Sequence, residues 1–122
     1  MNVADLATRS AELTAVERLS ALAQASRLNI FRLLVKAGPE GLRAGEIAST
    51  LGIPANTLST HLRILTDAGL LAVRAAARER IYAVRFETMR DLVAYLLEDC
   101  CQGHPELCGS LDIVRAPASC CS

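Results

Sequence analysis

The fold of this chain is decided by residues 43–71, whose sequence is RAGEIASTLGIPANTLSTHLRILTDAGLL. This stretch predicts two short helices, 43–51 and about 55–68, joined by the tight turn Gly52-Ile53-Pro54. Pro54 suits the first turn of the second helix, where its missing N–H costs nothing. In that helix leucines recur at i, i+4 and i+7, the spacing of one buried face: Leu58, Leu62 and Leu65. The pattern predicts a helix-turn-helix.

Two further helices are predicted before this motif. The first covers residues 13–24, where the apolar side chains share one helical face. The second is capped by Ser26 and runs to Val35, and Gly38-Pro39 stops it, as glycine past a helix end followed by proline commonly does.

The segment after the motif predicts a β-hairpin and one more helix. The strands are 70–74 and 79–84, which contain the β-branched and aromatic residues. Their connection, 75–78, has no glycine, so we expect a mobile tip rather than a tight two-residue turn. The last helix runs from Thr88 to about Cys101 and has one apolar side. The predicted fold class is mainly α with a β-hairpin (α+β): a winged helix-turn-helix, with the terminal helices covered in a homodimer.

The length of 122 residues predicts a single folded domain, 1–103, followed by a flexible cysteine-containing tail, 104–122. No apolar run approaches the roughly 18 residues that span a bilayer. The N-terminus, Met1–Asp5, lacks the basic and apolar regions of a signal peptide. We therefore expect a cytoplasmic protein without a membrane partner.

Charge is unevenly distributed along a chain whose net charge is zero. Residues 1–90 carry twelve Lys or Arg and eight Asp or Glu, whereas residues 91–122 carry one Arg and five acids. The stretch 55–90 has six Arg and three acids. A locally basic surface attracts a phosphate backbone even when the whole chain is neutral, so this stretch predicts nucleic acid as a partner.

Several strings resemble the ArsR/SmtB family of bacterial metal-responsive repressors. They are ASRLNI at 25–30, EIA at 46–48, LSTHLRILTDAGLL at 58–71 and RERIY at 78–82, and with their spacings they extend the resemblance over about 15–101. The resemblance implies a dimeric repressor that binds double-stranded operator DNA, and it implies no enzymatic activity.

The second helix of a helix-turn-helix enters the major groove of DNA. Polar side chains between its buried leucines are then expected to face base edges or phosphates, and arginines of the wing to contact phosphate or the minor groove. An ordinary solvated surface is the alternative for the wing arginines, and packing against the wing is an equal alternative for His61. The predicted DNA contacts are Asn56, Thr57, Ser59, Thr60, His61, Arg63, Arg74, Arg78 and Arg80.

All five cysteines lie between 100 and 122, and an odd number confined to one end does not suit a framework of intrachain disulfides. Cys100, Cys101 and Cys108 fall within nine residues, with a glycine and a proline between them that allow a bend. Trivalent arsenic forms three pyramidal bonds and prefers sulfur, and thiolates select soft ions in general. These three thiolates are therefore predicted to bind As(III) as the inducer.

This cysteine site departs from two arrangements of the family. The cysteine pair in the first helix of the motif is absent, because residues 46–49 read EIAS, and zinc-type Asp/His pairs are absent along the terminal helix, where Asp91 is followed by LV. Other ligands stay open: Sb(III), Cd, Pb, or Zn with His104 as a fourth ligand. So do thiol oxidation, a buried structural cysteine, and a thiol or metal-carrying protein that does not bind DNA. Cys120 and Cys121 are expected to be spare.

Overall fold

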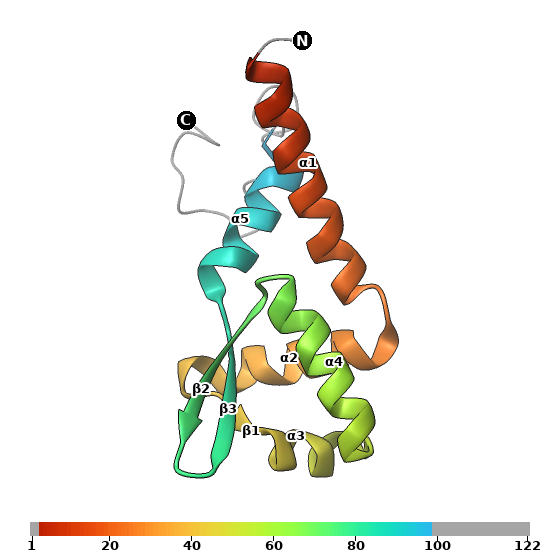
Figure 1. Cartoon of the computed structure of the whole chain (residues 1–122), viewed down its shortest axis with the longest axis vertical. Coiled ribbons are helices and arrows are strands. Elements are labelled where there is room, and N and C mark those ends of the chain that lie inside the picture. The colour runs from red at the N-terminus through yellow and green to blue at the C-terminus, as the bar shows by residue number, and fades with distance from the viewer. Residues whose placement is uncertain (1–2, 99–122) are drawn as a thin grey trace. The chain divides into compact units, whose positions relative to one another are not determined.

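The computed structural model describes residues 3–98, whose elements follow the predicted order with one added strand (Figure 1). The chain divides into two units, and the boundary lies between Arg85 and Phe86. No helix in residues 3–98 is both long and apolar enough to cross a bilayer. The elements are α1 (Val3–Leu22), α2 (Ala25–Ala37), a 3-10 turn (Gly38–Glu40), β1 (Leu42–Arg43), α3 (Ala44–Leu51), α4 (Ala55–Asp67), β2 (Leu71–Ala76), β3 (Glu79–Val84) and α5 (Phe86–Leu96).

The junction of α1 and α2 differs from the predicted one. The residue that caps α2 is Gln24, whose side-chain oxygen accepts a hydrogen bond from the backbone N–H of Arg27 at 2.9 Å. The predicted cap at Ser26 is therefore wrong, because Ser26 already lies in the first turn of α2. The Nε of Arg27 donates to the carbonyl oxygen of Ala21 at 2.6 Å and so satisfies one of the open carbonyls at the end of α1.

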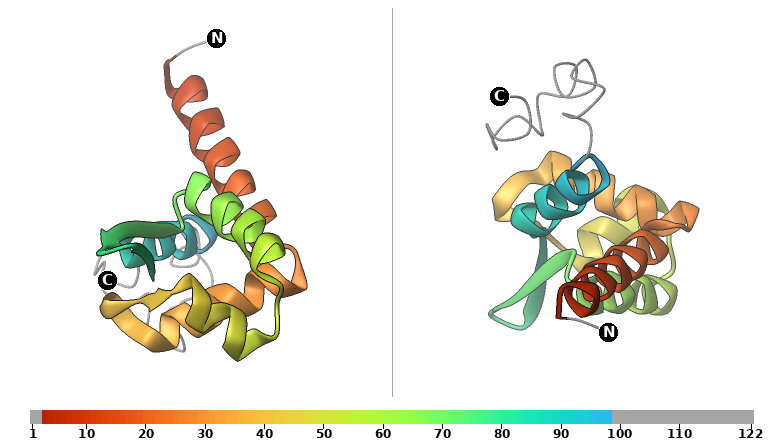
Figure 2. Two further views of the ribbon diagram at one scale, coloured as in Figure 1. Left: turned by 60° about the horizontal axis from the view of Figure 1, so that its bottom comes forward. Right: turned by 90° about the horizontal axis from the view of Figure 1, so that it is seen from above.

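Helices α2, α3 and α4 surround one apolar core, against which the C-terminal part of α1 also packs. The N-terminal part of α1 projects beyond these helices (Figure 2). The predicted inner face of α4 is confirmed, since each of its three leucines is at most 1% exposed. Burying one such side chain contributes about 1.5–3 kcal/mol, so this core fixes which face of α4 is turned outward. The fully buried side chains are Ile30, Leu34, Ile47, Leu58, Leu62, Leu65, Leu70 and Leu71.

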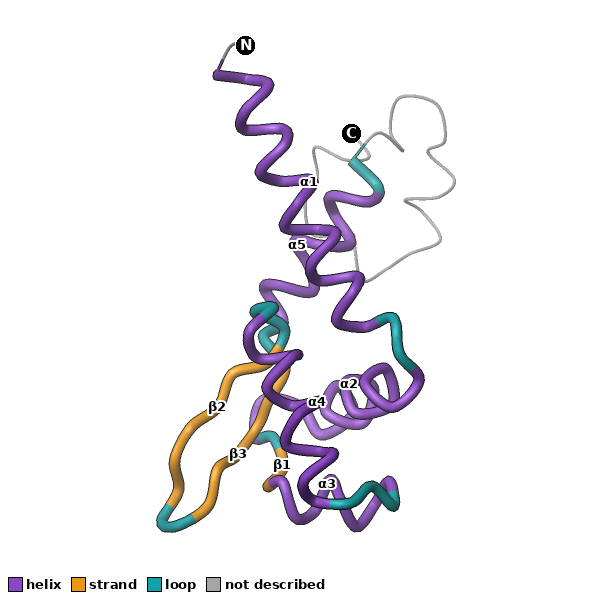
Figure 3. The backbone as a smooth tube through the Cα atoms, turned by 45° about the vertical axis from the view of Figure 1, so that its right-hand side comes forward, coloured by secondary structure: helices purple, strands orange, loops and turns teal. Residues whose placement is uncertain are grey.

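The three strands form an antiparallel sheet in the order β1-β3-β2. β1 was not predicted, because two residues are too few to show an alternating pattern. It pairs with β3, and Leu42 lies opposite Tyr82. Beyond β1, the paired strands β2 and β3 continue as a two-stranded ribbon (Figure 3). With α3 and α4 this ribbon makes up the winged helix-turn-helix that the sequence predicts.

The tip of the ribbon is a two-residue turn, so the predicted four-residue connection is wrong. Pairing continues to Ala76 opposite Glu79, which leaves Ala77 and Arg78 in the turn. Ala77 adopts a φ of 58°, in the left-handed region that tight hairpin turns require. An alanine thus takes the conformation that the sequence argument reserved for glycine.

Replacing Ala77 with glycine is expected to raise the free energy of unfolding by about 0.5–1 kcal/mol. Glycine removes a left-handed penalty of about 1–2 kcal/mol and loses part of this gain to the greater freedom of the unfolded chain. Urea denaturation measures the change. The matched control is Ala75→Gly inside β2, which is expected to lower the free energy of unfolding; equal losses in both variants would contradict the strained turn.

The terminal helix α5 begins at Phe86, two residues before its predicted start, and ends at Leu96. The N–H of Leu97 is shared between the carbonyl oxygens of Val93, at 3.1 Å, and Ala94, at 3.2 Å, which tightens the last turn. The predicted continuation is therefore wrong at Leu97 and Glu98, which form a turn. Residues 99–101 lie outside the described residues.

Candidate nucleic-acid interface

The outer face of α4 carries the polar side chains that the sequence predicts. Asn56, Thr57, Ser59, Thr60 and Arg63 are all exposed. They alternate with the buried leucines of the same helix, so the core of the domain holds them in one fixed orientation. The prediction that they face outward is confirmed, and their contact with DNA stays a prediction.

Hydrogen bonds inside α4 determine what these side chains can offer a ligand. The Oγ of Ser59 donates to the carbonyl oxygen of Ala55 at 3.1 Å, and the Oγ1 of Thr60 donates to that of Asn56 at 3.4 Å. The Oδ1 of Asn56 accepts from the N–H of Thr57 at 3.0 Å and satisfies one open donor at the start of α4. The hydroxyls thus present lone pairs to the outside, and Asn56 presents its amide N–H₂.

His61 behaves differently from the other predicted contacts. Its ring is half-buried, and its Nδ1 is enclosed with no hydrogen-bond partner among the described residues. Most buried polar atoms are paired, so an enclosed ring nitrogen is uncommon. Its burial supports the packing alternative for His61.

The ribbon separates the predicted wing arginines instead of gathering them. Arg74 lies opposite Ile81, and its Nη2 donates to the carbonyl oxygen of Glu40 at 3.2 Å. Arg80 lies opposite Ala75 and lines a pocket together with residues of α4. Successive side chains of a strand point to opposite faces, which places these two arginines on opposite faces of the ribbon.

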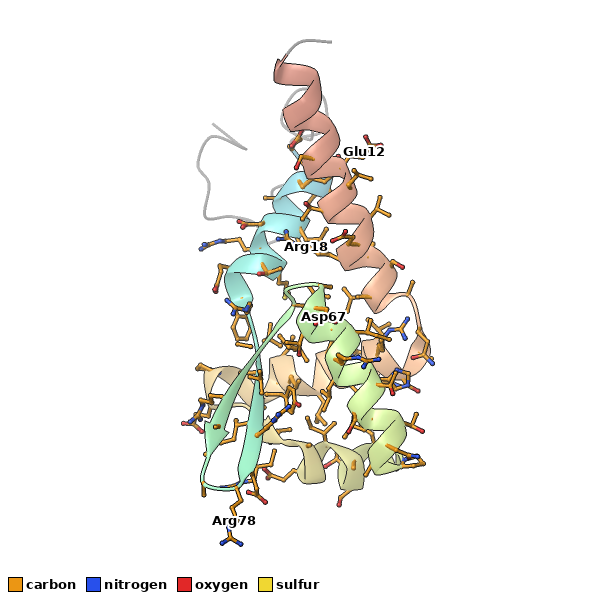
Figure 4. The ribbon with its side chains drawn as sticks, viewed as in Figure 1. Glu12, Arg18, Asp67 and Arg78 are labelled. Carbon is orange, nitrogen blue, oxygen red and sulfur yellow. The ribbon has the colours of Figure 1, made fainter. Side chains whose placement is uncertain are left out.

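Arg78 lies in the turn, at the free end of the ribbon (Figure 4). All three wing arginines are exposed. Of these three, Arg78 and Arg80 have no hydrogen-bond or ion-pair partner within residues 3–98. These two are therefore the wing residues best placed to bind an external phosphate.

Arg43, which the sequence argument did not single out, ties the wing to the helix-turn-helix. Its guanidinium pairs with the carboxylate of Glu79 and lies 3.9 Å from that of Glu46. The backbone N–H of Arg43 donates to Glu46 at 3.0 Å, which makes one half of a capping box at the start of α3; the guanidinium has no acceptor for the other half. Glu46 in the first turn of α3 was a local signal for the helix start, whereas the pairing of Arg43 with Glu79 depends on the sheet.

The predicted metal ligands Cys100, Cys101 and Cys108 lie outside the described residues, as do His104 and the cysteines at 120 and 121. Within residues 3–98, no three His, Cys, Asp or Glu side chains gather closely enough to hold a metal ion.

Comparison with known proteins identifies the class of this chain. A family model described as a helix-turn-helix domain matches residues 22–74. The chain is 36% identical over 78 residues to the uncharacterized HTH-type transcriptional regulator YceK of Bacillus subtilis (strain 168). It is 32% identical over 78 residues to the HTH-type transcriptional regulator YgaV of Escherichia coli (strain K12). Each match covers 64% of this chain and 77% of the relative.

Solved structures share the fold. HlyU from Vibrio cholerae N16961, also solved in a reduced form, is 32% identical, with a TM-score of 0.58 over 70% of this chain and 92% of HlyU. A possible transcriptional regulator for arsenical resistance is 23% identical, with a TM-score of 0.60 over 78% of this chain and 96% of that regulator. The homodimeric winged helix-turn-helix domain of Mb0332 from Mycobacterium bovis, a possible ArsR-family regulator, is 22% identical. Its TM-score is 0.60 over 85% of this chain and 93% of the Mb0332 domain. The chain therefore belongs to the helix-turn-helix transcriptional regulators, not to an enzyme family, and has the winged-helix fold of their ArsR-like members.

Proposed function

We propose that this chain is a dimeric repressor that leaves its operator DNA when As(III) binds the thiolates of Cys100, Cys101 and Cys108. The observation that carries the proposal is the spacing of these three thiols, which fall within nine residues and begin four residues after the end of α5. Arsenite exchanges its three hydroxyl groups for three sulfurs and releases water. Three soft donors in one short segment match this demand, because thiolates select soft ions.

The DNA-binding half of the proposal is supported by α4 and the ribbon. The major groove admits one α-helix, and α4 presents an exposed polar face of suitable chemistry. Exposed apolar side chains on α1, such as Leu13 and Val16 at 64% and 55%, support a second copy of the chain as their cover. A two-fold dimer presents two α4 helices to half-sites about 34–36 Å apart on one side of the duplex.

Induction follows if the bound metalloid draws Cys108 toward Cys100 and Cys101. This movement at the end of α5 then alters the angle between the α4 helices of the two subunits. A coupling of about 3 kcal/mol between inducer and operator lowers operator affinity about 150-fold. This is enough to free a promoter.

The experiment that tests the proposal is an operator-release assay. The reduced, metal-free chain selects a duplex from a random pool, and fluorescence anisotropy follows its release. Arsenite, antimonite, methylarsenite, cadmium, lead and zinc are titrated separately. Release by arsenite at the lowest concentration supports the proposal, whereas release by zinc alone would assign the thiols to a zinc site.

Thiol oxidation is a second candidate for the signal. The adjacent Cys100 and Cys101 favour it, and so does the relative HlyU, which has been solved in a reduced form. An oxidant would join two thiols in a disulfide, by way of a sulfenic acid that the second thiol attacks. Mass spectrometry after mild peroxide, compared with arsenite titration of the same sample, separates the two signals.

Asn56→Ala is expected to reduce the preference for the selected duplex over a random one by about 1–3 kcal/mol per half-site, the discrimination that an amide contact with a base edge supplies. Because the amide carries no charge, the salt dependence of binding is expected to stay unchanged. Titrations of both duplexes at several salt concentrations measure both quantities. The matched control is Asn29→Ala, an exposed asparagine on α2; an equal effect of both variants would remove Asn56 from base reading.

A further inference from the structure

A pocket of about 350 Å³ lies between α4 and the ribbon. One wall is formed by the outer face of α4, including Ser59, Arg63 and Asp67. The other wall is formed by Val73, Arg80 and Tyr82. Val73 and Tyr82 lie directly opposite each other in the sheet, and Arg80 is two residues before Tyr82, so the three side chains share one face of the ribbon.

The two walls place guanidinium groups on opposite sides of this pocket. Within residues 3–98, neither Arg63 nor Arg80 makes an ion pair or a side-chain hydrogen bond. Asp67 lies at the C-terminal end of α4 and lines the same pocket (Figure 4). An anion is therefore attracted to the part of the pocket between the two arginines and repelled from its Asp67 end.

The remaining pocket residues suit an anion that is joined to an apolar group. Val73 is 44% exposed although it is apolar, and Tyr82 beside it is half-buried. The hydroxyls of Ser59, Thr60 and Thr66 donate to backbone carbonyls, so the donors for an anion are the two arginines and the phenolic hydroxyl of Tyr82. An apolar patch next to two guanidinium groups suits a sugar joined to a phosphate.

We propose that Arg63 and Arg80 bind the same phosphate of the DNA backbone, with its deoxyribose on Val73 and Tyr82. The inference rests on the proposed function, because it assigns one contact within the operator complex. A shared phosphate fixes the distance between the helix in the major groove and the wing, and so sets the register of the domain on DNA. Arg78, at the far tip of the ribbon, binds a different part of the duplex.

The salt dependence of DNA binding tests whether one phosphate or two are involved. Each neutralised phosphate contributes about 0.9 to the slope of log K against log salt. If the phosphate is shared, Arg63→Ala with Arg80→Ala is expected to lower the slope by about 0.9 per subunit, which is about 1.8 for the dimer. The matched control, Arg63→Ala with Arg78→Ala, removes two separate contacts per subunit and is expected to lower the slope by about 3.6 for the dimer.

The measurement uses the full chain and a duplex that the wild type has selected from a random pool. All three arginines are exposed, so alanine at these positions leaves the apolar core unchanged, and circular dichroism verifies folding. A loss of about 3.6 per dimer with Arg63→Ala and Arg80→Ala together would overturn the shared phosphate and leave the proposed function intact. Failure of the wild type to bind any duplex would overturn both.

Discussion

Serine at Cys100, Cys101 or Cys108 is expected to keep operator affinity and to abolish release by arsenite. The thiols follow α5 and are not part of the reading helix, so their loss leaves the contacts of α4 unchanged. In the proposed site each substitution removes one of three As–S bonds, and with it the proposed coupling of about 150-fold in operator affinity. Anisotropy of the labelled operator, measured with and without arsenite in a phosphine reductant, detects both effects.

The remaining cysteines provide the matched control. Cys120→Ser and Cys121→Ser are expected to retain the full response, because these residues lie twelve or more positions beyond Cys108. Variants at the first three positions that no longer bind the operator in metal-free buffer would show that the thiols are structural. His104→Ala separates a zinc site from an arsenic site, since a Cys₃His site loses its fourth ligand and a three-thiolate site loses none.

The helices of the domain could be predicted because their signals are local. Leu58, Leu62 and Leu65 repeat with the helical period, and this period alone predicted the face that the structure buries. The signals that failed are not local. β1 is defined only by its pairing with β3, and the turn at Ala77 shows its positive φ only once the strands on both sides are aligned.

The candidate interface could be predicted as a set of residues but not as a surface. The separation of Arg74 from Arg80 follows from strand alternation once Arg80 is known to pair with Ala75, and this register comes from the structure. The partner of Arg74 is the carbonyl oxygen of Glu40, 34 residues away, which no local pattern reveals. The pairing of Arg43 with Glu79 is equally remote in sequence. Such contacts decide which arginines remain available to DNA.

Gly41→Ala is expected to lower the free energy of unfolding by more than about 4 kcal/mol, among the largest effects of single substitutions. Gly41 adopts φ 72° and ψ −171°, a region that only glycine occupies readily, which costs another residue about 1–3 kcal/mol. A Cβ there would also collide with the backbone carbonyl group of Tyr82, whose carbon would be 2.9 Å away. Backbone cannot rotate away as a side chain can, so β1 must separate from β3. Urea denaturation at fixed protein concentration measures the loss.

Gly38→Ala measures the backbone strain without the collision. Gly38 has nearly the same conformation, φ 78° and ψ −163°, but a Cβ there meets nothing within 4 Å. This control is expected to cost only the strain of about 1–3 kcal/mol. Because Tyr82 also lines the pocket between α4 and the ribbon, Gly41→Ala is expected to weaken DNA binding in proportion to the fraction of the chain that no longer folds, whereas Gly38→Ala leaves binding unchanged. Equal losses of stability in the two variants would mean that β1 is free to move away from β3, and the wing would then not be held in a fixed position beside α4.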